Sequence, residues 1–185
     1  MASVKKNAIR THRTILFVDE SGVYLLPGVV KTWAPRGETP ILHQYLTNDH
    51  LSIISAVSPE GAVYFQLQRE AYDSVAVIQF LEAVHQAIPG KLLVIWDNAT
   101  IHKGEKIRQY LADGAAAWLS LERLPSYAQD LNPDDGIWRY LKYVELKNVC
   151  CATLEMLEAV VTMAMQRIQQ MTNIVKAAFR EAGLA

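Results

Sequence analysis

Two short apolar segments, each ending in an aspartate, constrain the fold of this chain more than any other feature. They are TILFVD at residues 14–19 and KLLVIWD at residues 91–97. Near-continuous apolar runs of this length are typical of strands buried inside a sheet. A sheet with buried strands needs layers that cover it. We therefore predict an α/β fold with a mixed central sheet and helices on both faces.

The rest of the sequence alternates between strand and helix patterns. Further strands are predicted at residues 29–33, 50–57, 62–68 and about 117–121. Ser-Pro-Glu-Gly at residues 58–61 is turn chemistry and predicts a hairpin. Helices are predicted from the N-cap Asp73 to Ile88, from 104 to 112, from the Asn132-Pro133 start, and from 153 to 181.

Size and composition favour one globular domain over residues 14–185, preceded by a basic tail at residues 1–13. No segment resembles a membrane span or a secretory signal, and the adjacent Cys150 and Cys151 favour a reducing cytoplasm. There are 18 basic and 19 acidic residues. This neutrality counts mildly against a dedicated DNA-binding module, but not against an enzyme that concentrates carboxylates at a metal site.

Acidic residues stand at three element ends. Asp19 and Asp97 end the two apolar strands, and Asp134 and Asp135 open a helix. Sites in open α/β sheets form beyond the carboxyl ends of strands, so these carboxylates could converge on divalent cations. Two cations about 4 Å apart could clamp both oxygens of a phosphoryl transfer. Taken singly, each aspartate could equally be an ordinary strand-end, turn or helix-start residue.

Four motifs in order narrow the choice. They are FVDESG at 17–22, TWAPRGETP at 32–40, WDNATIH at 96–102 and LPSYAQDLNPDDGIWRYLK at 124–142. Over residues 14–183 the chain resembles the DDE transposases of bacterial insertion sequences in the Tc-mariner superfamily. The resemblance implies a ribonuclease H-like fold and Mg²⁺-dependent cutting and joining of transposon-end DNA, with Mn²⁺ able to substitute.

The resemblance implies that Asp19, Asp97 and Asp135 are the catalytic, metal-binding triad. Two departures stand out, since the related branch usually has Glu at the third position and an apolar residue where this chain has Asp134. Helical geometry predicts that Asp134 points into the apolar stripe of the helix. Three interpretations follow: a first turn open to solvent, an extra carboxylate in the site, or a decaying copy.

Other residues are placed around the triad. Asn98, His102 and Asp134 are expected to support it, with a structural hydrogen bond the favoured role for His102, and Glu20 is expected to point to the opposite side of the strand from Asp19. Trp33 is expected in the core rather than along a DNA channel. The predicted DNA contacts are Arg36, Lys103, Lys106, Arg139 and Lys142.

The expected partners are transposon-end and target DNA, in the cytoplasm of a bacterium and near its nucleoid. The closing helix has apolar residues at spacings typical of a coiled-coil seam, which would make a homodimer, but covering the sheet is the favoured interpretation. Relatives carry an N-terminal helix-turn-helix domain that is missing ahead of Asp19. A split-frame product, a truncation and an isolated catalytic domain all remain open. The alternative function is an inactive relict that binds DNA or dimerises.

Overall fold

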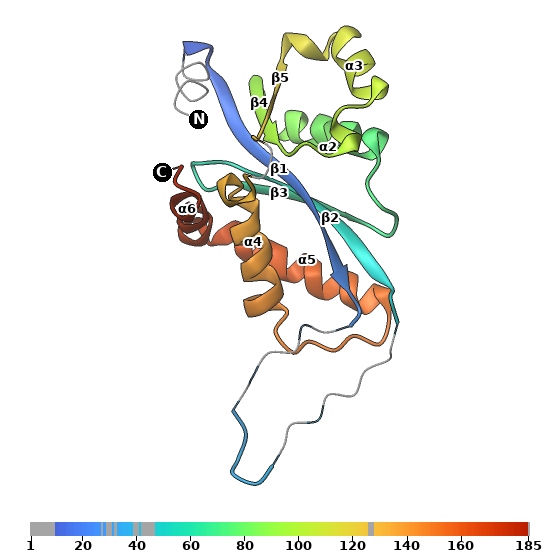
Figure 1. Ribbon diagram of the computed structural model, residues 1–185, viewed down its shortest axis with the longest axis vertical. Coiled ribbons are helices and arrows are strands. Elements are labelled where there is room, and N and C mark those ends of the chain that lie inside the picture. Colours follow the sequence, from blue (N-terminus) through green and yellow to red (C-terminus); the bar gives the residue numbers. More distant parts are fainter. Residues whose placement is uncertain are drawn as a thin grey trace.

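A five-stranded mixed sheet forms the centre of the computed structural model, which describes residues 10–26, 28, 31, 33–38, 41, 47–125 and 128–184 (Figure 1). The strands lie in the order β3-β2-β1-β4-β5. β1 pairs antiparallel with β2, β2 antiparallel with β3, and β4 parallel with both β1 and β5. The predicted mixed sheet is thus confirmed. The strand bounds are Arg13–Tyr24, His50–Val57, Val63–Gln68, Lys91–Trp96 and Leu119–Arg123 for β1 to β5.

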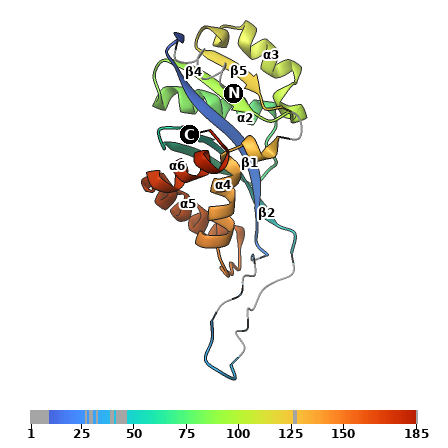
Figure 2. The same cartoon turned by 60° about the vertical axis from the view of Figure 1, so that its left-hand side comes forward.

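Helices cover both faces of this sheet, as expected (Figure 2). α2 (Ser74–Ala87) and α3 (Glu105–Ala112) lie on one face, and α4 (Asp134–Tyr140), α5 (Leu154–Gln170) and α6 (Thr172–Glu181) on the other. Short η helices connect them: η1 (Thr100–His102), η2 (Ala115–Ala117), η3 (Gln129–Leu131) and the π-helical η4 (Leu141–Glu145).

The alternation of side chains along β1 separates two apolar cores. Leu16 and Val18 pack in the core under α2, whereas Phe17 packs in the core under α5 and α6. The Phe17 ring meets the Phe179 ring edge-on, with the centroids 5.4 Å apart. Because side chains alternate with a period of two, Asp19 lies on the α4–α6 face and Glu20 on the α2–α3 face.

Several predicted boundaries are wrong. β1 does not end at Asp19 but continues to Tyr24, because it pairs with β2 along that stretch. Of the strand predicted at 29–33, residues 29, 30 and 32 lie outside the described residues, and Lys31 and Trp33 are not in a strand. β5 begins two residues later than predicted, after η2. In the described residues no helix is long and apolar enough to cross a membrane.

The predicted closing helix is two helices. The chain breaks at Met171, with φ −100° and ψ 64°, so that α6 turns onto α4 while α5 stays against β2 and β3. The seam residues Leu157, Val161, Ala164 and Ile168 are buried in the core. The favoured interpretation, a helix that covers the sheet, is therefore confirmed.

Close packing of α4 on α6 depends on Gly136. A Cβ atom at this position would lie 2.7 Å from Cβ of Ala178. Gly136→Ala should therefore force the two helices apart at a cost of about 1–3 kcal/mol, which outweighs the gain of up to about 1 kcal/mol in helix propensity.

A double-mutant cycle with Ala178→Gly tests this contact. Urea unfolding should show that Ala178→Gly destabilises the wild type but rescues Gly136→Ala, with a coupling of about 1 kcal/mol or more. Strictly additive effects would show that the two residues do not restrain each other.

Candidate active site

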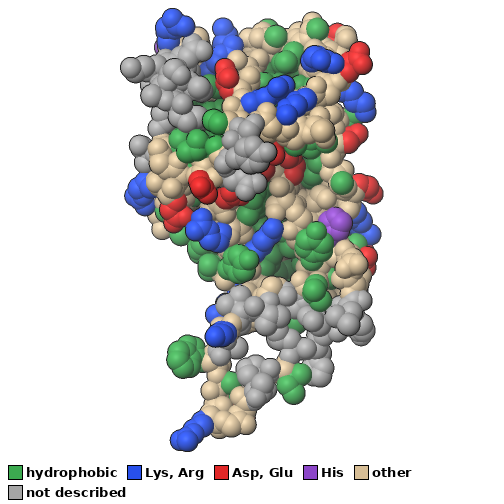
Figure 3. Space-filling model, in the orientation of Figure 1, with side chains coloured by type: hydrophobic (Ala, Val, Ile, Leu, Met, Phe, Trp, Pro, Cys, Tyr) green, Lys and Arg blue, Asp and Glu red, His purple; other side chains and the backbone are tan. Residues whose placement is uncertain are grey.

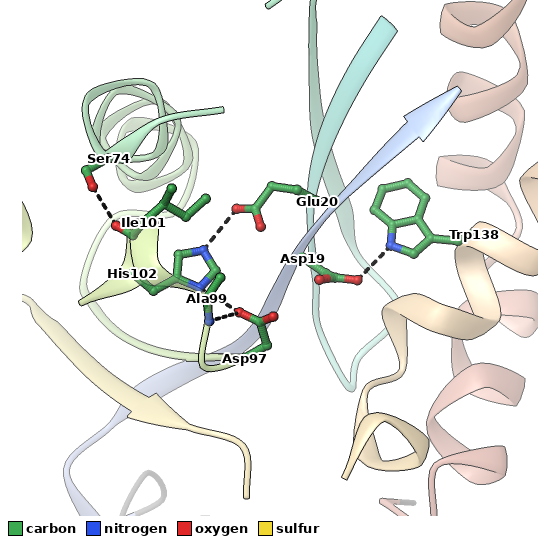
Figure 4. A network of polar contacts seen from close by, with 8 residues as sticks. All are labelled: Asp19, Glu20, Ser74, Asp97, Ala99, Ile101, His102 and Trp138. Carbon is green, nitrogen blue, oxygen red and sulfur yellow. Dashed lines mark hydrogen bonds and ion pairs between the residues drawn. The ribbon is translucent and has the colours of Figure 1, made fainter. Parts of the chain in front are cut away.

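The parallel pairing of β1 with β4 brings two of the predicted site residues together. Val18 lies opposite Trp96 in the register, so the next residues are Asp19, within β1, and Asp97, which directly follows β4. In Figure 4 Asp19 comes from β1 and Asp97 from the loop after β4, with Asp19 turned toward Trp138 and Asp97 toward His102. The strands that carry them are thus neighbours, as the predicted convergence requires, although Asp19 lies within its strand and not at its end.

Asp19 is held in a protein environment that disfavours its charge. Its Oδ2 accepts a hydrogen bond from the indole N–H of Trp138 at 2.9 Å. Burial raises the pKa of Asp19 to about 7, the Trp138 bond opposes this shift, and the charges of Glu20, Asp135 and Asp97 add to it. A carboxyl with this pKa is half-neutral near pH 7 unless a cation compensates its charge.

Asp134 points into the core, as its helical position predicted. It is fully buried, and the hydroxyl of Ser55 on β2 donates a hydrogen bond to its Oδ1. Its Oδ2 has no partner among the described residues. Burial, reinforced by the charges of Asp19, Glu20 and Asp135, raises the pKa of Asp134 well above its usual value. The interpretation of a solvent-open first turn is therefore wrong.

The start of α4 differs slightly from the prediction. The helix begins at Asp134, not at Pro133, but the side chain of Asn132 still accepts a hydrogen bond from the Asp134 backbone at 3.2 Å. Asp135 follows on the exposed side of this turn. Burial raises the pKa of Asp135, the nearby Arg139 and Lys142 oppose the rise, and Asp130 adds to it.

The predicted triad is only partly assembled. The charge of Asp135 contributes to the raised pKa of Asp19, so the two carboxylates interact. However, within the described part of the chain no three His, Cys, Asp or Glu side chains are close enough to hold one metal ion together. Of the predicted triad, Asp19 and Asp97 are the two residues that the strand register brings next to each other.

A second polar network supports Asp97. Its Oδ1 accepts hydrogen bonds from the Ala99 backbone at 2.8 Å and from Nδ1 of His102 at 2.9 Å. Nε2 of His102 contacts Glu20 at 3.1 Å. Burial lowers the pKa of His102, but the bonds and charges of Glu20 and Asp97 outweigh it and raise this pKa above its usual value. The structural hydrogen bond expected for His102 is present.

Asn98 fixes the turn that follows Asp97 by a contact with the β5 side of the sheet. Its side-chain amide donates to the Leu124 carbonyl at 2.9 Å, which ties this turn to the end of β5.

The sequence did not predict three features of the site: Trp138, Ser55 and the link from Glu20 to His102. An indole N–H in a buried stripe needs an acceptor, so Trp138 could have been found. Ser55 carries no such signal.

Lys142, one of the five predicted DNA contacts, lies close enough to Asp19 for the two charges to interact. Lys142 donates to Ser21 Oγ at 2.7 Å, on the face of β1 that carries Asp19. Burial lowers the pKa of Lys142, and the charges of Asp19 and Asp135 oppose that shift. In Figure 3 carboxylate side chains cross the middle of the face, with Lys and Arg side chains above and below them.

The other predicted contacts are more peripheral. Arg139 pairs with Glu181 at 3.1 Å, Lys106 with Asp73 at 3.7 Å, and Lys103 is exposed after η1. Arg36 and Trp33 lie in a segment that runs well away from the sheet (Figure 1). Trp33 is 100% exposed, so its expected place in the core is wrong.

The pKa of Asp19 predicts how stability depends on pH when divalent cations are absent. Because its pKa rises from 3.8 to about 7 on folding, ionising Asp19 costs stability. This cost is absent below about pH 4 and is complete above about pH 7. Asp19→Asn keeps an acceptor for Trp138, so thermal unfolding should show it to be more stable than wild type at pH 8.

The difference between Asp19→Asn and wild type should shrink toward pH 4, where the wild-type carboxyl is also neutral. Asp113→Asn, a change at an exposed aspartate, serves as the control and should shift the thermal unfolding midpoint neither at pH 8 nor at pH 4. A pH-independent difference, or a loss of stability at pH 8, would contradict the burial argument.

Comparison with known proteins agrees with this geometry. Residues 14–158 match the sequence profile of the DDE superfamily endonucleases. Among curated proteins, no sequence matches. The mariner Mos1 paired-end complex with Mg is similar in structure, with a TM-score of 0.67 and 16% identity over 98% of this chain and 58% of that chain. The catalytic domain of Mos1 mariner transposase has a TM-score of 0.54 and 14% identity, over 98% and 90% of the two chains.

These structural likenesses show that the fold is ribonuclease H-like, as the sequence resemblance implied. The chain spans under two thirds of the transposase chains in the Mos1 complexes. The profile match covers most of the chain, including Asp19, Asp97 and Asp135. By this match the chain belongs to the DDE superfamily endonucleases.

Proposed function

We propose that this chain is the catalytic domain of a DNA transposase, which cuts one strand at a transposon end and joins it to target DNA. The observation that carries the proposal is that Asp19 in β1 and Asp97 directly after β4 occupy neighbouring positions in a DDE superfamily endonuclease. The similar structures support it, since they include a Mos1 strand transfer complex and a pre-cleavage Mos1 transpososome.

We further propose that Asp19, Asp97 and Asp135 hold divalent cations, with Mg²⁺ the natural ion and Mn²⁺ a substitute. Carboxylate oxygens are the ligands that these hard cations prefer. The raised pKa of Asp19 supports this assignment, because a cation would favour its charged form. Mos1 complexes with Mg and with Mn are among the similar structures. When bound, the cations would supply Lewis-acid stabilisation of the phosphodiester oxygens.

The side chains around the pair fix its geometry. Trp138 orients Asp19 through one hydrogen bond, and His102 with the Ala99 backbone orients Asp97. Lys142, held beside Asp19 by Ser21, is placed to contact a phosphate near the site. Arg36, Lys103, Lys106 and Arg139 are proposed as further phosphate contacts.

The proposed reaction has two steps and needs no covalent protein intermediate. In the first step, water adds its oxygen to phosphorus and the P–O3′ bond breaks, which leaves a 3′-hydroxyl and a 5′-phosphate. In the second, that 3′-hydroxyl attacks a target phosphodiester, and the displaced target strand leaves with its own 3′-hydroxyl. The phosphodiester bond is conserved in this second step, so no energy source is required.

The partners proposed are transposon ends and target DNA, in the cytoplasm of a bacterium at its nucleoid. Paired-end assembly is proposed because a paired-end complex of Mos1 transposase is among the similar structures. An inactive relict is not favoured. Its main support was Asp134, and the structure accommodates this residue in the core with Ser55 as its partner.

Metal-dependent nicking tests the proposal directly. Purified protein with Mn²⁺ or Mg²⁺ should nick supercoiled plasmid, and Asp19→Ala or Asp97→Ala should lower the rate about a hundredfold or more, since each removes several kcal/mol of transition-state stabilisation. Asp113→Ala is the matched control at an exposed aspartate and should nick normally. Nicking that survives both site changes, or an excess of chelator, would rule out this function.

A second experiment identifies the third carboxylate. Asp135→Ala should abolish nicking, because the exposed Asp135 and not the buried Asp134 is assigned to the cation. Asp134→Leu combined with Ser55→Ala replaces a buried polar pair by apolar groups, so it should retain nicking and raise the unfolding midpoint. The opposite pattern of activity would show that the assignment is wrong by one residue.

A further inference from the structure

His102 is buried between two carboxylates that come from different elements. Its Nδ1 lies 2.9 Å from Asp97 Oδ1, and its Nε2 lies 3.1 Å from Glu20 Oε1. The imidazole is 0% exposed, the Glu20 side chain 19% and the Asp97 side chain 50%. The chain of contacts therefore runs from a nearly buried acid through a buried ring to the solvent-exposed carboxylate of the proposed site (Figure 4).

The ring has little freedom to move. It stacks flat on Trp96, with the centroids 4.3 Å apart and an interplanar angle of 1°. The turn that carries it is tied to α2, because the Ser74 hydroxyl donates to the Ile101 carbonyl at 2.6 Å. Stacking fixes the plane of the imidazole, but it does not fix which nitrogen faces Asp97.

Glu20 determines which ring nitrogen of His102 faces Asp97. A buried N–H without an acceptor costs free energy, so Glu20 favours a protonated Nε2 and holds that edge of the ring toward β1. Nδ1 then faces Asp97. For both contacts to be hydrogen bonds to carboxylates, both ring nitrogens must donate. Glu20 thus determines the orientation of the donor that Asp97 receives.

We propose that Glu20 is a positioning residue for Asp97, acting through His102. Its contact with the ring lets His102 and the Ala99 backbone together hold Oδ1 of Asp97, so that Oδ2 is the oxygen left for a divalent cation. Mutation of residues that orient a metal ligand in this way typically lowers the affinity for the metal about tenfold to hundredfold. This inference rests on the proposed function and adds to it a residue that touches neither cation nor DNA.

The test is the affinity of the isolated chain for Mn²⁺, measured by calorimetry without DNA. Glu20→Leu removes the contact with the ring and should weaken binding about tenfold to hundredfold. Glu20→Gln can still hydrogen-bond Nε2, so its affinity should stay close to wild type. Glu122→Leu makes the same change at an exposed glutamate of β5 and is the matched control; it should bind normally. Thermal unfolding without metal confirms that each variant is folded.

Each other outcome has a defined meaning. Wild-type affinity in Glu20→Leu would overturn the positioning role and leave the proposed function standing. So would equal losses in Glu20→Leu and Glu20→Gln, or in Glu20→Leu and Glu122→Leu, since these would indicate a general effect of losing an acidic charge. A wild-type chain that binds no Mn²⁺ would contradict the proposed function itself.

If Glu20→Leu does not fold, Glu20→Val, which also offers no acceptor to Nε2 and suits a strand, takes its place and should bind Mn²⁺ about tenfold to hundredfold more weakly. Wild-type affinity in Glu20→Val would overturn the positioning role.

Discussion

The parallel register between β1 and β4 is the constraint on which the rest of the site depends. With Val18 opposite Trp96, Asp19 falls beside Asp97, and Glu20 falls on the opposite face of β1 from Asp19, where His102 contacts both Glu20 and Asp97. A slip of one residue would exchange the faces of Asp19 and Glu20. It would place the proposed ligand in the core under α2 and the positioning residue against α4. The apolar residues that precede each aspartate fill the cores on both faces of the sheet, so such a slip would be costly.

The burial of two neighbouring carboxylates, Asp19 and Asp134, lowers the stability of the fold if both are charged, and their hydrogen bonds offset this cost only in part. Asp19 has the Trp138 indole and Asp134 has the Ser55 hydroxyl, but both pKa values remain raised by burial and mutual repulsion. Lys142 provides the nearby positive charge, at the expense of its own solvation. A divalent cation would offset the repulsion and burial cost that remain, so the electrostatics around Asp19 favour cation binding.

The sequence predicted the sheet, the two covering layers and the adjacency of Asp19 and Asp97, because apolar strands and helical periodicity record burial locally. The burial of Asp134 followed from the same periodicity. Other features depend on tertiary contacts that leave no local pattern. The break at Met171 exists because α6 packs on α4, where Gly136 allows close approach, and the Ser55 contact with Asp134 joins residues 79 apart. Trp33 was misplaced because its aromatic character suggested a core that this segment does not reach.

The central claim is that Asp19 and Asp97 share a divalent cation, and anomalous diffraction from a crystal soaked in Mn²⁺ tests it most directly. The account predicts an anomalous peak at bonding distance, roughly 2 Å, from carboxylate oxygens of both residues. It also predicts that the peak disappears in Asp19→Asn. A peak that contacts neither carboxylate, or the same peak in Asp19→Asn, would contradict the account.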